Sequence, residues 1–232
     1  MLISTKGRYA LRMLADIAMH QGDDGYVSMK RSMADLRADT IGGYNTLIND
    51  QKNEVGETNV TTVLFNNEIT TLHDCTSIQE VKPLTRDDYL PCGTTALLDA
   101  IGTTVDSVGN RLANTPEKER PYKVIVAIMT DGYENASLEY NKAQIKQKIE
   151  HQQEKYNWTF MFIGAGIDAI SEGASLGVKD GFSVRVRGTS NSTFATYDAI
   201  SKMTSASKMY VNNAAFSTEA VKIMSELKDG AE

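Results

Sequence analysis

The sequence is poor in cysteine, with only Cys75 and Cys92 among 232 residues. These two match no metal-binding spacing and are too few for a framework of disulfides, so they suit a reducing compartment. No apolar run is long enough to cross a membrane. Charges at Lys6, Arg8 and Asp16 also interrupt any signal-peptide core. We therefore expect a cytoplasmic protein without a membrane partner.

The sequence also has few residues that point to catalysis or to nucleic acid. Its three histidines, His20, His73 and His151, lie in unrelated segments, and neither a Gly-x-Ser-x-Gly elbow nor a P-loop is present. The net charge is −6 and no dense basic block occurs, which disfavours nucleic acid as the main partner. These absences favour a protein that is not an enzyme.

What the sequence does contain is the pattern of one soluble α/β domain. Apolar residues at helical spacing predict helices over 6–21, 34–52, 97–112, 138–155, 167–176, 191–209 and 217–228. Short apolar runs predict strands over 26–29, 59–65, 68–73, 123–129, 158–163 and 182–186. Asn66 and Asn67 separate two of these strands and favour a hairpin, because Asn tolerates the positive φ of a tight turn. Strands that alternate with helices after this hairpin indicate a mostly parallel sheet with helices on both faces.

Three residues with hydroxyl or carboxylate side chains lie in loops at the expected ends of strands. Asp131 follows the apolar run "VIVAIM" (124–129) after one intervening threonine, Thr95 stands in "PCGTTALLDAIG" just before a helix, and Ser32 precedes the helix from residue 34. Ligands of such sheets bind outside the carboxyl ends of the strands, and hydroxyl and carboxylate oxygens suit a hard cation such as Mg²⁺. Helix and turn capping uses the same residue types, so capping is the alternative for each residue alone.

In this order, the segments resemble the von Willebrand factor type A domain. That family has a doubly wound α/β fold and a metal-ion-dependent adhesion site (MIDAS). "GTTALLDAIG" resembles its second site element, with Thr95 as ligand, and "TDGYEN" resembles the third, with Asp131. "ADLRADTIGGYNTLI" (34–48) resembles the helix after the first element in bacterial members, and the resemblance covers about residues 31–210. It implies Mg²⁺ or Mn²⁺ at the site, and a protein partner that adds an acidic side chain as a further metal ligand.

The first site element, Asp-x-Ser-x-Ser in the family, is incomplete in this chain. Aligned on Ser32, the family's Asp position holds Ser28 and its middle Ser position holds Lys30. A lysine near Asp131 could neutralise the carboxylate without a metal, and a lysine that faces solvent is the alternative. The sequence thus predicts a site with metal ligands Ser32, Thr95 and Asp131 whose affinity for divalent ions is weak or absent.

The first thirty residues show a second resemblance. "MLISTKGRYALRMLADIAMH" with "YVSMK" resembles the start of winged helix-turn-helix regulators of the iron–sulfur and cysteine repressor type. The recognition helix that a DNA reader needs does not follow, so specific DNA binding is not expected. We therefore divide the chain into an N-terminal helical segment, 1–27, and a von Willebrand factor A-like domain, 28–232. The alternative for the first segment is an ordinary amphipathic helix packed on the sheet.

The segment "FIGAGIDA" fits the G-x-G-x-x-A pattern of dinucleotide-binding proteins through Gly164 and Gly166. Arg185 and Arg187 follow, where a 2′-phosphate of NADP could be met. The pattern stands late in the chain, whereas dinucleotide folds usually carry it on the first strand. The sequence therefore favours a non-catalytic protein-binding domain, with a DNA-binding regulator and an NADP-dependent oxidoreductase as alternatives.

Overall fold

The computed structural model describes residues 9–15, 26–90 and 94–230, with side chains described for 37–90 and 94–229. The strands are β1 (Tyr9–Ala15), β2 (Asn59–Phe65), β3 (Ile69–Ser77), β4 (Lys123–Thr130), β5 (Thr159–Ala165) and β6 (Ser183–Val186). The helices are α1 (Tyr26–Lys52), α2 (Leu97–Asn114), α3 (Lys142–Tyr156), α4 (Ala169–Ser175), α5 (Ser190–Met209) and α6 (Asn213–Gly230). Two short 3₁₀ helices, η1 (Ile78–Glu80) and η2 (Glu117–Glu119), complete the described elements.

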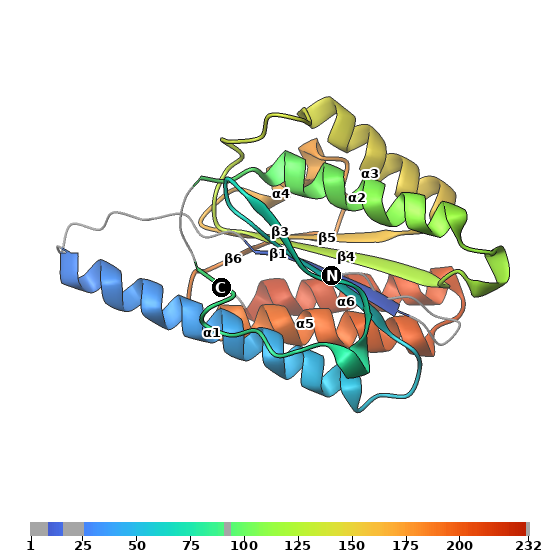
Figure 1. Ribbon diagram of the computed structural model, residues 1–232, viewed down its shortest axis with the longest axis horizontal. Coiled ribbons are helices and arrows are strands. Elements are labelled where there is room, and N and C mark those ends of the chain that lie inside the picture. The colour runs from blue at the N-terminus through green and yellow to red at the C-terminus, as the bar shows by residue number, and fades with distance from the viewer. Residues whose placement is uncertain (1–8, 16–25, 91–93, 231–232) are drawn as a thin grey trace.

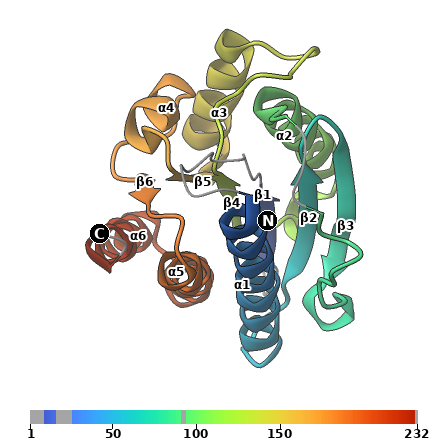
Figure 2. The ribbon, with the colours of Figure 1, turned by 90° about the vertical axis from the view of Figure 1, so that its left-hand side faces the viewer.

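The strands form one sheet in the order β3-β2-β1-β4-β5-β6. Every neighbouring pair is parallel except β2 and β3, which form the predicted antiparallel hairpin. Helices α2, α3 and α4 cover one face of the sheet, and α1, α5 and α6 cover the other (Figures 1 and 2). The predicted fold class, a doubly wound and mostly parallel α/β sheet with an antiparallel edge strand, is confirmed.

The centre of the sheet is apolar on both faces. Every residue of β4 except Met129 is buried, and β5 is buried from Phe160 to Gly164. A strand that packs helices on both sides reads as a continuous apolar run, because neither face of its side chains meets water. This burial explains why the sequence pattern located β4 and β5 closely.

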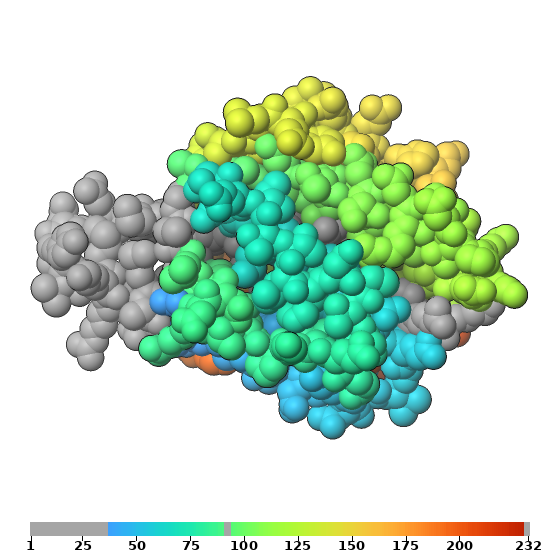
Figure 3. All heavy atoms as spheres, viewed as in Figure 1, coloured from blue at the N-terminus to red at the C-terminus, as the bar shows by residue number. Residues whose placement is uncertain are grey.

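The hairpin and its surroundings form one rim of the domain. Asn66 closes the turn: its backbone N–H donates to the Glu68 carbonyl at 3.0 Å, and its side-chain oxygen accepts from the Glu68 N–H at 2.7 Å. Strand β3 is the edge of the sheet and its side chains are mostly exposed or half-buried. Figure 3 shows the face that the hairpin and α2 build together.

The position of the first strand differs from the sequence prediction. The helix predicted over 6–21 is wrong over Tyr9–Ala15, which forms the central strand β1, and the rest of that range lies outside the described residues. The strand predicted over Tyr26–Met29 is also wrong, because these residues open α1. The place predicted for that strand, between β2 and β4, is occupied by β1.

Backbone pairing explains this difference. Strand β1 pairs on one side with β2 and on the other with β4. Without it, two strand edges would stay open inside the sheet, and each buried unpaired backbone group would cost about 1–3 kcal/mol. This requirement outweighs the helical spacing of Leu11 and Leu14, which is a weak local preference. The separation of 1–27 from 28–232 stays a prediction, since residues 1–8 and 16–25 lie outside the described part.

Helix α1 packs on α5 through a close approach at a glycine. A Cβ atom at Gly43 would lie 2.2 Å from Cδ2 of the buried Tyr197, so only glycine leaves room for that ring. On the same helix Tyr44, Leu47 and Ile48 are buried. In the part of the chain that the structure describes, none of the helices has the length and apolar character to cross a membrane.

Candidate functional site

The carboxyl ends of the parallel strands meet along one edge of the sheet. The strand pairing places Ala15 beside Met129, Thr130 beside Gly164, and Ala165 beside Val186. The segments that follow β4, β5 and β6 therefore leave the sheet at the same edge, which Figure 2 shows facing the viewer. We call this edge, with the loops after β2, β4, β5 and β6, the strand-end face.

The segments that carry Thr95 and Asp131 are joined at this face. The backbone N–H of Thr95 donates to Oδ1 of Asn135 at 2.8 Å, and the Asn135 N–H donates to the Thr95 carbonyl at 3.0 Å. The next residue, Ala96, donates its N–H to the Asn66 carbonyl at 2.8 Å. Three loops from distant parts of the sequence are thus fixed to one another by backbone hydrogen bonds.

Glu134 binds the start of helix α2 to the loop after β4. Helix α2 has Ala96 at its N-cap position, which offers no side-chain acceptor. Oε2 of Glu134 accepts the backbone N–H of Leu98 at 2.8 Å, so a residue from another loop takes the role of the missing cap. Oε1 accepts from the N–H groups of Ala136 and Ser137 at 2.8 and 2.7 Å.

These contacts affect the titration of Glu134. Burial alone raises the pKa of this carboxyl group. Hydrogen bonds from Leu98, Ser137 and Ala136 favour its charged form more strongly, so the pKa lies below its ordinary value. The Glu134 carboxylate therefore serves to hold the loop after β4 rather than to bind a ligand.

Asp99 completes the connection in the opposite direction. It lies in the first turn of α2, is only 7% exposed, and accepts three backbone N–H groups of the loop after β4. Leu138 donates to Oδ2 at 2.7 Å, and Glu139 and Tyr140 donate to Oδ1 at 2.9 and 2.8 Å. In return, the Asp99 N–H donates to Oγ of Ser137 at 3.0 Å.

Sequence reasoning missed four of the residues that fix these loops to one another, Glu134, Asn135, Ser137 and Asp99.

Asp131 itself is the first residue after β4. Its neighbours form a tight turn in which Oγ1 of Thr130 donates to the Gly132 carbonyl at 2.8 Å and accepts the Gly132 N–H at 3.2 Å. The Asp131 residue is half-buried, whereas Thr95 is buried. The arrangement places one carboxylate in the turn that leaves the sheet, next to the segment fixed to Thr95.

The residues aligned with the first site element lie elsewhere than predicted. Ser28, Lys30 and Ser32 belong to helix α1, not to a loop that follows a strand. Helix α1 begins on the side where the parallel strands end (Figure 1). The side chains of these three residues lie outside the described part. The alignment that assigned Ser28, Lys30 and Ser32 together assumed a strand over 26–29, where α1 lies instead, and the assignment of Ser32 as a metal ligand stays a prediction.

The described donors fit a divalent ion poorly. Among the residues that the structure describes, no group of three or more His, Cys, Asp or Glu side chains could hold a metal. Asp131 and Thr95 offer one carboxylate and one hydroxyl, which are the right kind of ligand for Mg²⁺. With a single negative charge, however, they would hold it weakly. The neighbouring carboxylates Glu134 and Asp99 already accept backbone N–H groups.

The loop after β5 joins the same face. The phenolic oxygen of Tyr133 accepts the Asp168 N–H at 3.1 Å, which links the Asp131 turn to the start of α4. Both glycines of the dinucleotide-like pattern have structural reasons. A Cβ at Gly164 would lie 2.7 Å from Cβ of Ala169, and Gly166 has φ of 72°. The pattern is thus explained without a nucleotide.

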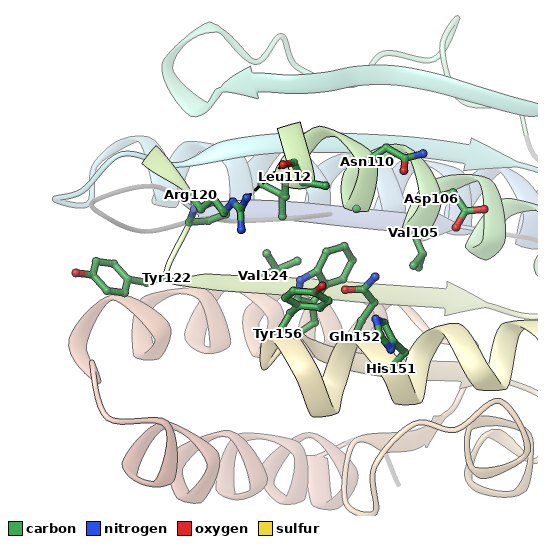
Figure 4. Close-up of a pocket in the computed structure, with 14 residues that line it drawn as sticks. Val105, Asp106, Asn110, Leu112, Arg120, Tyr122, Val124, His151, Gln152 and Tyr156 are labelled. Carbon is green, nitrogen blue, oxygen red and sulfur yellow. Dashed lines mark hydrogen bonds between the residues drawn. The ribbon is translucent and has the colours of Figure 1, made fainter. Parts of the chain in front are cut away.

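A separate cavity lies at the opposite end of β4. Its volume is about 430 Å³, and it is lined by residues of α2, of α3 and of the segment that leads from η2 into β4, including Arg120, Tyr122, His151 and Tyr156 (Figure 4). The Arg120 side chain donates to the carbonyls of Thr115 and Ala113 at 2.8 and 3.2 Å. This cavity shares none of the residues that build the strand-end face.

Comparison with known proteins supports the fold. No family model matches the chain, and no curated protein matches its sequence. Among solved structures, proximal thread matrix protein 1 from the mussel byssus superposes with a TM-score of 0.54 and 15% identity, over 84% of this chain and 45% of that one. A structure of that protein with a zinc-occupied MIDAS motif gives a TM-score of 0.50 and 17% identity, over 83% and 44%. The von Willebrand factor type A protein from Catenulispora acidiphila gives 0.50 and 10%, over 84% and 42%.

These similarities establish a von Willebrand factor A fold. The expectation of that fold is confirmed, whereas the winged-helix resemblance of residues 1–30 stays a prediction. The chain spans less than half the length of these three structures.

Proposed function

We propose that the chain is a non-catalytic protein-binding domain that uses its strand-end face. The observation that carries this proposal is the reciprocal pair of hydrogen bonds between Thr95 and Asn135, reinforced by Glu134 and Asp99. A surface whose loops are fixed before binding loses less conformational freedom on association. Proteins of the same fold include one with a zinc-occupied MIDAS motif, which supports a binding role for this edge.

We further propose that this edge is an adhesion site with weakened metal binding. Thr95 and Asp131, with Ser32 from α1, are the residues that would hold Mg²⁺ or Mn²⁺. The bound ion would supply positive charge that attracts an acidic side chain of the partner. With only one carboxylate among the described donors, we expect binding of these ions to be weak, so that metal contributes little. The cytoplasmic location expected from the cysteine content belongs to the same proposal.

The positions of the described histidines support a non-catalytic role. His73 lies on β3, where Nδ1 is 3.2 Å from the hydroxyl of Tyr44, and His151 lines the cavity at the other end of β4. Neither has a described hydrogen bond to the loop of Asp131. A histidine that transfers protons at this face would have to lie within hydrogen-bond reach of the bound partner.

Site-directed photo-crosslinking tests the proposed binding face. Leu138 lies in the loop after β4 and Val55 in the turn after α1, and both side chains are 94% exposed. A benzophenone amino acid at each position provides a matched pair with equal access to solvent. We expect a protein adduct from position 138 and none from position 55. Equal adducts from both positions, or adducts from position 55 alone, would contradict the proposal.

A further inference from the structure

Three cations gather at the end of the strand-end face that is farthest from the hairpin. Arg185 of β6, Arg187 just after it and Lys228 near the end of α6 line one cavity of about 580 Å³. We call these three residues the basic corner. All three are exposed, and none forms a salt bridge with another described residue. No carboxylate in the described part of the chain neutralises these three charges.

Local structure explains how the cations come together. Along β6 the buried Val184 and Val186 alternate with the exposed Arg185, because successive side chains of a strand point to opposite faces of the sheet. Helices α4 and α6 lie on either side of this strand (Figure 2). The same cavity includes Gly166 and Ile170, and the Ile170 side chain is 52% exposed. Positive charge and an apolar contact thus lie side by side.

The basic corner is continuous with the Asp131 turn. The hydrogen bond between the Asp168 N–H and the Tyr133 hydroxyl joins the loop after β5 to the loop after β4. Gly166, two residues before Asp168, already lines the cavity of the basic corner. A partner that contacts Tyr133 on this face can therefore extend to the three cations without leaving the surface.

The distribution of charge assigns a role to this corner. The described metal ligands at Asp131 are too few to hold a cation firmly, whereas the three cations of the basic corner form no salt bridge with any described residue. We propose that the basic corner binds an acidic segment of a protein partner without a metal ion. This inference rests on the proposed function. In it, the three cations of the basic corner replace the positive charge that a bound ion would give. The net charge of −6 and the apolar contact at Ile170 favour a peptide over nucleic acid.

The test uses a fluorescein-labelled, glutamate-rich peptide with a central leucine and measures its anisotropy with the full chain. The corner variant carries Arg185→Gln, Arg187→Gln and Lys228→Gln. The control variant carries Lys82→Gln, Arg86→Gln and Lys155→Gln, which removes three exposed cations from other elements. Both variants change the net charge equally.

We expect the corner variant to bind the peptide about tenfold more weakly than the control variant, since several exposed charge pairs each contribute modestly. Binding should fall with added salt and should not change with EDTA. Equal binding by the two variants would overturn the inference, as would tighter binding of an oligothymidylate than of the peptide. If EDTA abolishes peptide binding while the corner variant binds normally, the inference falls and the metal-dependent form of the proposed function stands. An adduct from position 138 that the corner variant retains in full also overturns the inference alone.

Discussion

Replacing Glu134 by Gln should weaken the connection between α2 and the loop after β4. The carboxylate accepts four hydrogen bonds, from the N–H groups of Leu98, Ala136 and Ser137 and from the hydroxyl of Ser137. A Gln side chain has the same shape but only one acceptor oxygen. Whichever way its amide turns, the NH₂ group faces two donors and cannot accept from either.

The size of the effect follows from these contacts. A buried hydrogen bond to a charged group contributes about 1.5–3 kcal/mol. Two such bonds are lost here, but Glu134 is only half-buried, so water replaces part of the loss. We expect the free energy of unfolding at pH 7 to fall by about 2 kcal/mol. Glu139→Gln, an exposed carboxylate on the same loop, should change it by less than about 0.5 kcal/mol.

The pH dependence provides an independent check. Hydrogen bonding holds the pKa of Glu134 below its ordinary value despite burial, so its stabilisation is complete above the unfolded pKa of about 4.3. That contribution is lost as the pH falls through the lower folded pKa. Urea unfolding of wild type and Glu134→Gln should therefore show a difference that is constant from pH 7 to pH 5 and shrinks in more acidic buffer. A difference near zero at pH 7, or one that grows on acidification, would refute the reasoning.

Three further predictions concern packing, metal and DNA. Gly43→Ala should destabilise the domain by about 1–3 kcal/mol in urea unfolding, since its Cβ would overlap the Tyr197 ring. Gly42→Ala, whose Cβ would lie 3.9 Å from the nearest ring atom, should be neutral or gain up to about 1 kcal/mol. Calorimetry should give only weak Mg²⁺ or Mn²⁺ binding, on the order of millimolar, and Asp131→Ala should remove it; submicromolar binding would contradict the incomplete donor set. A mobility-shift assay at physiological salt should show no sequence-specific DNA complex with the full chain, and such a complex would revive the regulator alternative for residues 1–30.

Most of the fold could be predicted because its signals are local. The Asn66-Asn67 turn located the hairpin, and the apolar runs located β4 and β5 because buried parallel strands must be apolar on both faces. Strand β1 could not be found in this way. Its residues, Tyr9–Ala15, include Arg12 and carry apolar residues at helical spacing, and only pairing with β2 and β4 makes them a strand. That pairing is a long-range property that no local window contains.

The residues of the candidate site also differ in whether a local sequence signal or a long-range contact identifies them. Thr95 and Asp131 could be predicted as strand-end residues, because the order of elements brings the ends of parallel strands together. The roles of Glu134 and Asp99 depend on contacts that span 36 to 41 residues. One signal was nevertheless present: Asp99 interrupts the apolar start of α2. A carboxylate there needs backbone donors from outside the helix, which the loop after β4 supplies.

At one end of the strand-end face the protein compensates its own charges, and at the other end no described residue does so. This difference favours one orientation of a bound partner. Near α2, the negative charges of Glu134 and Asp99 are compensated by backbone N–H groups, so they hold the loop and attract little from solution. At the basic corner no described carboxylate compensates the cations. An acidic segment approaching this face therefore gains energy mainly at the β6 end. The partner's acidic residues should accordingly face α4 and α6, with its neutral surface over Thr95 and Asp131.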